Sequence, residues 1–336
     1  MKKNYFMLAA AALMFAACAE TDFVNPVPVN EGEAIGFETF ANLPTKAEIT
    51  DETALQGVGF QVWGYKKLTS AADWTDQFTV FNNNSVSYVA SAWTSEVARY
   101  WDRTATYKFY AAAPSSQKNY YSIAPATGKI SITGAESAIS TASKDYLIDR
   151  DGETNIDGAT ASTVGFNFHH IMSKLSFKLK AGIAKDITVT RLVMTGWNSG
   201  NGTFVQTLTT TPGTADHTSE WTIAAAGEGS VTLVGTGASD ATIVLPADKS
   251  VKNVTDAYIM VPQEIAASTL TFTIDYKINE TSEVFTAQVG KLSAEQIWGT
   301  DAHTTYTITV GPDEIKFNVS SVCGWDAGTP GPGLDI

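Results

Sequence analysis

The chain has 336 residues, of which 35 are acidic and 22 are basic, so its formal net charge is −13 at pH 7. Such an acidic chain, without a cluster of basic residues, is a poor partner for nucleic acids or anionic lipids. Hydrophobic residues make up 44% of the sequence, which excludes a wholly disordered protein.

The N-terminus combines a positive start with an apolar run. Two lysines precede 13 uninterrupted apolar residues, 5–17. A membrane-crossing helix needs about 20 apolar residues, so residues 1–17 are more typical of a secretory signal peptide. Cys18 follows directly, an arrangement that resembles a bacterial lipobox, in which this cysteine is acylated and begins the mature chain. The alternative is an ordinary signal peptide followed by a cysteine that stands there by chance.

The remaining chain is expected to contain a tether and two domains. Residues 18–34 are rich in proline, asparagine and acids, and are expected to form an extended tether. If Cys18 is acylated, Cys323 is the only cysteine left, so no intrachain disulfide can form. The mature length exceeds the range of about 250–300 residues in which single cores stop growing, which favours two domains, at 35–160 and 161–336.

Alternating apolar and polar residues predict β-strands along most of the chain. In residues 269–278, for example, Phe272, Ile274 and Tyr276 share one face. Strands with one solvent-exposed face are typical of antiparallel sheets, so we predict an all-β fold of two antiparallel sandwiches. The clearest strands are expected at 58–65, 106–112, 173–180, 187–194, 203–209, 257–261, 269–278, 304–310 and 315–321. Short helices are expected at 51–55, within 136–144 and at 293–298.

A polar stretch over residues 149–163 is the predicted domain boundary. Its acids occupy positions 1, 3 and 5 of an EF-hand loop. However, Thr154 stands where the loop needs glycine, and Thr160 stands where it needs a bidentate glutamate. We therefore interpret the stretch as a solvated linker.

The sequence contains no recognisable catalytic, metal or cofactor motif. The adjacent His169 and His170 are predicted to point to opposite faces of a strand, and neither His217 nor His303 has zinc-ligand spacing. No serine lies in a GxSxG elbow. We therefore predict a protein that is not an enzyme and that uses no cofactor and no metal.

Tryptophans are the one feature that suggests a small ligand. Trp63, Trp74, Trp93 and Trp101 cluster in the first half of the chain. They can pack in sandwich cores, the interpretation that we favour, or stack on sugar rings at the surface.

Several segments together resemble the fimbrillin family of Bacteroidetes, the subunits of the type V pilus and their Mfa-like relatives. No single segment is specific, but their order along the chain is. The segments are ACAETDFVN at the cysteine, RYWDRTATYKFYAAAP (99–114), KDYLIDR (144–150), FNFHHIMSKLSFKLK (166–180) and IWGTDAHTTYTITVGPDEIKFNVSSVCGW (297–325). The resemblance implies two tandem transthyretin-like β-sandwich domains. It also implies a lipoprotein of the outer membrane that is exposed at the surface and becomes part of a fimbria.

The resemblance further implies assembly by strand exchange with other pilus subunits. In the family, a trypsin-like protease removes the first strand together with the lipid, and a strand from the next subunit fills the vacated place. Here Ile35, Phe37 and Leu43, which we expect to be buried side chains of the removed segment, precede Lys46 and Ala47, the candidate processing site. The family usually carries arginine at the cut position, so the lysine is a departure. Without a cut at Lys46, the protein would stay lipidated, as an anchor subunit or an adhesin-like relative.

The sequence also allows other interpretations of the C-terminal segment and of the function. The glycine- and proline-rich segment 323–336 is either a donor segment for a neighbouring subunit or a frayed terminus. The chief rival function is a glycan-binding outer-membrane lipoprotein of a polysaccharide-utilisation system. A secreted hydrolase with a dispersed site is a third possibility. Host ligands or glycans are conceivable partners, whereas nucleic acid is not.

Overall fold

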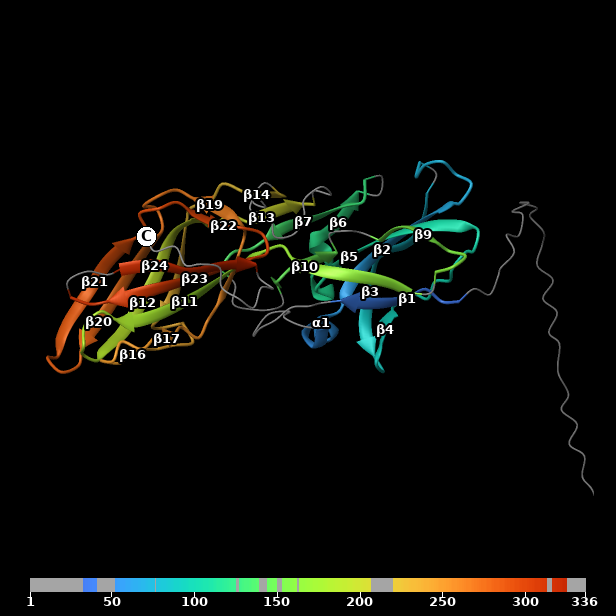
Figure 1. Cartoon of the computed structure of the whole chain (residues 1–336). Helices are drawn as coiled ribbons and strands as arrows, with labels where there is room; N and C mark the ends of the chain where they lie inside the picture. Colours follow the sequence, from blue (N-terminus) through green and yellow to red (C-terminus); the bar gives the residue numbers. More distant parts are fainter. Residues whose placement is uncertain are drawn as a thin grey trace, which may run out of the picture.

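The computed structural model describes residues 33–40, 52–75, 77–124, 127–138, 144–149, 153–161, 163–206, 220–312 and 316–324. Within these ranges the regular structure is predominantly β-strand, which confirms the predicted all-β class (Figure 1). The helices that lie wholly within the described ranges are α1 (Glu52–Val58) and a 3₁₀ turn, η1 (Ser115–Tyr120). None of the helices in the described part of the chain is long and apolar enough to cross a membrane.

The first half forms a sheet that closes on itself, here called the closed sheet. A ring of seven strands closes through the pairing of β2 with β5, and β9 pairs with the other edge of β5. In sheet order the strands are β2 (Phe60–Leu68), β3 (Phe78–Val89), β4 (Ala92–Ser95), β1 (Gly36–Phe40), β10 (Thr163–His170), β8 (Leu147–Asp149), β5 (Ala105–Ala113) and β9 (Glu153–Asp157). This ring differs from the open sandwich predicted for residues 35–160, because closure removes the sheet edges that a sandwich keeps.

The second half contains two five-stranded sheets. One consists of β17 (Lys252–Asn253), β11 (Ser173–Ala181), β23 (Ala302–Val310), β24 (Lys316–Gly324) and β18 (Tyr258–Met260). The other consists of β15 (Glu228–Val234), β12 (Ile187–Asn198), β20 (Thr271–Ile278), β21 (Glu283–Lys291) and β16 (Ile243–Leu245). A single apolar cluster joins buried residues of both sheets. The transthyretin-like class of the two halves stays a prediction.

A four-stranded sheet lies between the two halves (Figure 1). Its strands are β14 (Trp221–Ile223), β13 (Gly202–Val205), β7 (Lys129–Ala135) and β6 (Tyr121–Ala124), and a further pair joins β19 (Gln263–Ile265) to β22 (Gln296–Trp298). The central pairing, between β7 and β13, joins a strand from each half of the chain. An apolar cluster links this sheet to the outer face of the closed sheet.

Alternating apolar residues predict a strand correctly where only one of its faces is buried. In β20, Phe272, Ile274 and Tyr276 are buried and the residues between them are only partly buried, as predicted. Strand β5 is buried almost throughout, because Phe109 faces the interior of the ring and Tyr110 faces the four-stranded sheet. Such a strand has no wet face, and its sequence is therefore nearly continuously apolar.

The structure corrects three expectations. Two strand pairs are parallel, β1 with β10 and β11 with β23, although the sequence predicted antiparallel sheets throughout. Residues 293–298, predicted to be helical, end in strand β22. Residues 153–157, predicted to belong to a solvated linker, form β9 and pair with β5. Alternation reveals that a segment is a strand but not which way its partner runs, and short segments take the structure that their neighbours impose.

The strand pairing does not follow the predicted boundary between residues 160 and 161. Strand β10 comes after that position, yet it pairs with β1 and β8 in the closed sheet. The chain enters the five-stranded sheets with β11, directly after β10. The polar composition of the 149–163 stretch therefore does not mark the point where the pairing changes.

Candidate functional site

The residues of the predicted site, Cys18 for lipidation and Lys46 with Ala47 for processing, lie outside the described residues. The described element closest to Lys46 on its N-terminal side is β1, which ends at Phe40. On the other side, α1 begins at Glu52. The candidate functional site is therefore β1 together with the strands that hold it.

The backbone of β1 is held mainly by one neighbour. It runs parallel to β10 over five residue pairs, from Gly36 opposite Thr163 to Phe40 opposite Asn167. Its pairing with β4 is limited to Phe37 opposite Trp93. Just before the strand, the Ile35 amide donates to the carbonyl of residue 99 at 2.8 Å. The strand thus closes the ring between β4 and β10.

The side chains of β1 complete the interior of the ring. Ile35 and Phe37 are 7% and 6% exposed, which confirms their predicted burial. The ring of Phe37 lies 5.5 Å from that of Phe81, 5.9 Å from that of Phe166 and 6.1 Å from that of Phe60, measured between centroids. Burying two such side chains contributes about 3–6 kcal/mol to folding, at ~1.5–3 kcal/mol each. Leu43, the third residue predicted to be buried there, lies outside the described residues.

A hydrogen bond joins the two sides of the segment that contains Lys46. The Thr39 hydroxyl, on β1, donates to the carboxylate of Glu52, the first residue of α1. Residues 39 and 52 are therefore neighbours in space, and the intervening segment begins and ends at the same place on the surface of the ring. A cut within it would leave β1 in position, held only by non-covalent contacts.

Strand β10 depends on β1 along its first part. Residues 163–167 of β10 pair with β1, whereas only residues 168–170 pair with β8. Within the described strands, the first part of β10 has no second ladder partner. Loss of β1 would therefore open the ring, expose an unpaired edge on β10 and uncover the aromatic side chains around Phe37.

The polar clusters elsewhere do not form a metal site in the described ranges, where no three histidine, cysteine or acidic residues are grouped suitably. Asp149 ends β8 and is buried, and its carboxylate accepts a hydrogen bond from the Asn167 amide at 3.3 Å. Asp149 therefore serves as a buried hydrogen-bond acceptor at the end of β8.

The histidines occupy structural positions that the sequence did not reveal. His169 is partly exposed and His170 fully buried, in keeping with opposite faces of β10. The Nδ1 atom of His170 lies 3.0 Å from the Oδ1 atom of Asp145, and both side chains are fully buried. His217 lies outside the described residues.

A second histidine contact lies between β11 and β23. The Nε2 atom of His303 lies 2.9 Å from the Ser176 hydroxyl oxygen. Burial, with a smaller contribution from the charges of Lys174 and Lys178, lowers the pKa of His303 to about 4. The ring is therefore neutral at neutral pH and serves as a hydrogen-bonding bridge across two parallel strands.

Two of the four tryptophans singled out in the sequence are core residues. Trp63 and Trp101 are 2% and 3% exposed, so they belong to the core, as we favoured. Trp93 is half-buried and packs edge-on against Phe60. Trp74 lies beneath the Lys108 ammonium group, 4.5 Å from its ring centroid.

Comparison with known proteins identifies a matching family and similar solved structures. A family model described as fimbrillin-like matches residues 45–325. No curated protein sequence matches the chain. A solved putative cell adhesion protein from Bacteroides uniformis is 14% identical, covering 87% of this chain and 99% of its own, with a TM-score of 0.51.

Two further solved structures are more distant. A putative cell adhesion protein from Bacteroides ovatus is 14% identical, with 88% and 97% of the two chains covered and a TM-score of 0.46. The tip fimbrial protein Mfa3 from Porphyromonas gingivalis is 8% identical, with 80% and 94% covered and a TM-score of 0.37. At these identities the likeness concerns the fold, and only the Bacteroides uniformis protein exceeds a TM-score of 0.5 among the three.

Proposed function

The chain belongs to the fimbrillin-like family, and on that premise we propose that it is a structural subunit of a cell-surface fimbria that supports adhesion. We further propose that it assembles by exchange of β-strands after proteolysis. The similar structure from Bacteroides uniformis is described as a putative cell adhesion protein, in keeping with this role.

The position of β1 is the observation that carries the proposal. It is a five-residue strand that closes a ring, fills the interior with Ile35 and Phe37, and is followed by the segment that contains Lys46. Cleavage between Lys46 and Ala47 would separate it covalently from α1. A strand of a second subunit with apolar residues at the same spacing would then restore both the ladder on β10 and the aromatic core.

Lipidation at Cys18 would precede this step. The acylated cysteine anchors the precursor in the outer membrane, because several acyl chains on one residue give stable membrane attachment. Since Cys18 lies on the same side of Lys46 as β1, the cut releases the anchor and the strand together.

Limited trypsin digestion tests the assembly step. We expect the purified full chain to be cut after Lys46 and to give ladders of oligomers that resist SDS. The variant Lys46→Gln serves as the matched control, since it removes the cut but no described contact. We expect it to stay uncut at this position and monomeric.

Two outcomes would overturn the assembly proposal. One is a wild-type chain that is cut after Lys46 but remains monomeric. The other is a Lys46→Gln variant that forms the same ladders as the wild type, since oligomers would then not need the cut.

Lipidation is tested by growing cells with an alkyne analogue of palmitate. We expect the label on the wild-type precursor and its loss in Cys18→Ala. An equally labelled Cys18→Ala protein would contradict the proposed anchor, without bearing on strand exchange.

A further inference from the structure

A small pocket opens at one end of the closed sheet, away from β1. It has a volume of about 310 Å³, within the lower part of the range of about 300–1,000 Å³ typical of small-molecule sites. Its walls come from the end of β2, the start of β3, the start of β5 and the turn before β5. The lining residues are Lys66, Lys67, Leu68, Phe78, Asp102, Thr104 and Ala105.

The walls of the pocket are mostly apolar. Phe78 is 58% exposed and Leu68 is 51% exposed, so both present apolar surface to solvent at the rim. Single exposed apolar side chains are common on proteins, but here two of them border one hollow. Phe78 in particular offers an aromatic ring that is available for contact with a ligand.

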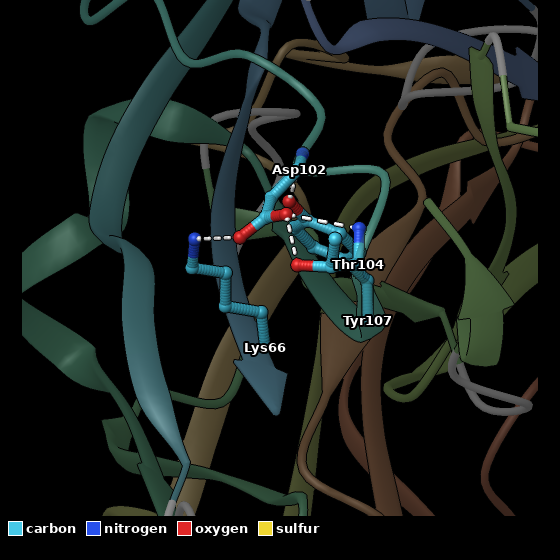
Figure 2. A network of polar contacts seen from close by, with 4 residues as sticks. All are labelled: Lys66, Asp102, Thr104 and Tyr107. Carbon is cyan, nitrogen blue, oxygen red and sulfur yellow. Dashed lines mark hydrogen bonds and ion pairs between the residues drawn. The ribbon is translucent and has the colours of Figure 1, made fainter. Parts of the chain in front are cut away.

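The polar side of the pocket is a fixed pair of charges. The Lys66 ammonium group lies 2.9 Å from the Oδ2 atom of Asp102. The Oδ1 atom of Asp102 accepts hydrogen bonds from the Thr104 amide at 3.0 Å and the Thr104 hydroxyl at 2.7 Å. Figure 2 shows the side chains of Lys66 and Thr104 directed at the Asp102 carboxylate. The Asp102 amide donates to the Tyr107 hydroxyl at 2.6 Å.

These contacts keep the carboxylate ionised and in place. Burial alone would raise the pKa of Asp102, but the hydrogen bonds from Thr104 and Lys66 lower it below its usual value. The Lys66 ammonium group has three donors, of which the contact with Asp102 uses one. The pair can therefore both donate to and accept from a ligand without rearranging.

Part of the backbone that lines the pocket is already paired in the closed sheet. Residues 66–68 of β2 pair with residues 105–107 of β5 on one side, and Lys66 pairs with Phe78 of β3 on the other. Recognition by strand addition needs unpaired backbone groups, which Lys66, paired on both sides, does not offer. The peptide probe in the experiment below tests whether the pocket takes a peptide instead.

We propose that this pocket binds a single sugar ring of a glycan. A pyranose has an apolar face of C–H groups and a rim of hydroxyls, which matches an aromatic wall beside a fixed carboxylate–ammonium pair. The C–H face lies on Phe78, one hydroxyl donates to Asp102, and a neighbouring hydroxyl accepts from Lys66. No lining residue belongs to β1, so failure of this site would leave the proposed assembly untouched.

Saturation-transfer difference NMR with the purified full chain tests the proposal. The probes are the methyl glycosides of glucose, galactose, mannose and N-acetylglucosamine, with N-acetylleucine methylamide as a peptide probe. We expect at least one glycoside to receive saturation and the peptide probe to receive none.

Variants then locate the binding. Phe78→Ala and Asp102→Asn should each weaken the affinity by about tenfold or more, whereas Phe78→Trp, which keeps an aromatic face, should retain binding. Val89→Ala is the matched control, because Val89 is also 58% exposed and lies at the opposite end of the same strand, β3. It should leave the affinity unchanged.

Three results would overturn the proposal. They are the absence of transfer to all four glycosides, equal binding by the wild type and by both Phe78→Ala and Asp102→Asn, and Phe78-dependent binding of the peptide probe alone. Because Phe78 is exposed, its replacement should not prevent folding, and an unfolding curve of each variant verifies this.

Discussion

The two parallel strand pairs of the molecule differ in how firmly they are held. Strand β11 runs beside β23 over nine residue pairs, from Ser173 opposite Ala302 to Ala181 opposite Val310. Strand β1 runs beside β10 over only five. Both β11 and β23 have a second neighbour along much of their length, whereas β1 touches its other neighbour, β4, at one residue pair.

The difference is what the proposed strand exchange requires, since β1 has fewer backbone partners than β11 and β23. Parallel pairs are slightly less stable per residue than antiparallel pairs, so a short one depends on its side chains. In β1 these are chiefly Ile35 and Phe37. The β11–β23 pair contributes Leu175, Phe177 and Leu179 together with Tyr306 and Ile308, all in one core.

The largest expected effects come from truncating a buried aromatic residue in each parallel pair. Phe37→Ala and Phe177→Ala should each lower the free energy of unfolding by about 3–5 kcal/mol, because both rings are buried among other rings. Chemical denaturation measures the change. After trypsin has removed the strand and a donor has replaced it, the Phe37 effect should vanish and the Phe177 effect remain. An undiminished Phe37 effect in the processed oligomer would show that β1 is not exchanged.

A smaller loss of stability is expected from disrupting the contact between Asp145 and His170, which holds the end of β10 independently of β1. Asp145→Asn should lower the free energy of unfolding by about 1–3 kcal/mol, since His170, at the end of β10, loses a buried hydrogen-bonding carboxylate. Glu136→Gln is the control, because Glu136 pairs with Lys144 at the surface and should contribute less than about 1 kcal/mol. Equal losses in the two variants would argue against a special role of the buried contact.

Acid should lower the free energy of unfolding through protonation of His303, which bridges β11 and β23. The unfolded chain takes up a proton at His303 near pH 6.5, whereas the folded chain does so only near pH 4. The stability linked to His303 is therefore fully present above pH 6.5 and is lost as the pH falls toward 4. Allowing for screening of a partly exposed ring, the loss is on the order of 1–2 kcal/mol.

Unfolding curves at several pH values measure this dependence. Because many carboxylates titrate in the same range, the informative quantity is the difference between the wild type and His303→Gln. The stability of the wild type relative to His303→Gln should fall between pH 6.5 and pH 4 and stay constant above pH 7. A constant difference throughout would mean that His303 does not titrate differently in the two states.

The smallest change in the free energy of unfolding is expected from a substitution in the pocket. Lys66→Met removes an ion pair whose side chains are 32% and 22% exposed, so the free energy of unfolding should change by less than about 1 kcal/mol. Thermal unfolding measures it. A much larger loss would indicate that Lys66 serves the stability of the closed sheet rather than a ligand.

Sequence reasoning recovered what depends on local patterns. The alternation in β20 and the burial of Ile35 and Phe37 follow directly from residue spacing. It missed the closure of the sheet, because the pairing of β2 with β5 joins segments that each look like an ordinary strand. It also missed β10 as the partner of β1, since the two lie far apart in the chain and nothing local encodes a parallel neighbour.

The pocket and the buried histidine contact were beyond sequence reasoning for a similar reason. Lys66, Phe78 and Asp102 come from three different elements, and only the ring brings them together. Asp145 and His170 are brought into contact in the same way. The tryptophans drew attention to sugars, but the exposed aromatic ring that borders a hollow is Phe78.

The four-stranded sheet has a mechanical consequence. Its central pair, β7 with β13, fastens the first half of the chain to the second, and its apolar cluster includes Ile130 and Ile132 from one half with Phe204 and Trp221 from the other. A fibre built from such subunits transmits tension through every junction along its length. Pulling the halves apart would have to break this ladder and open its core at the same moment, so each subunit is built to carry load as one piece.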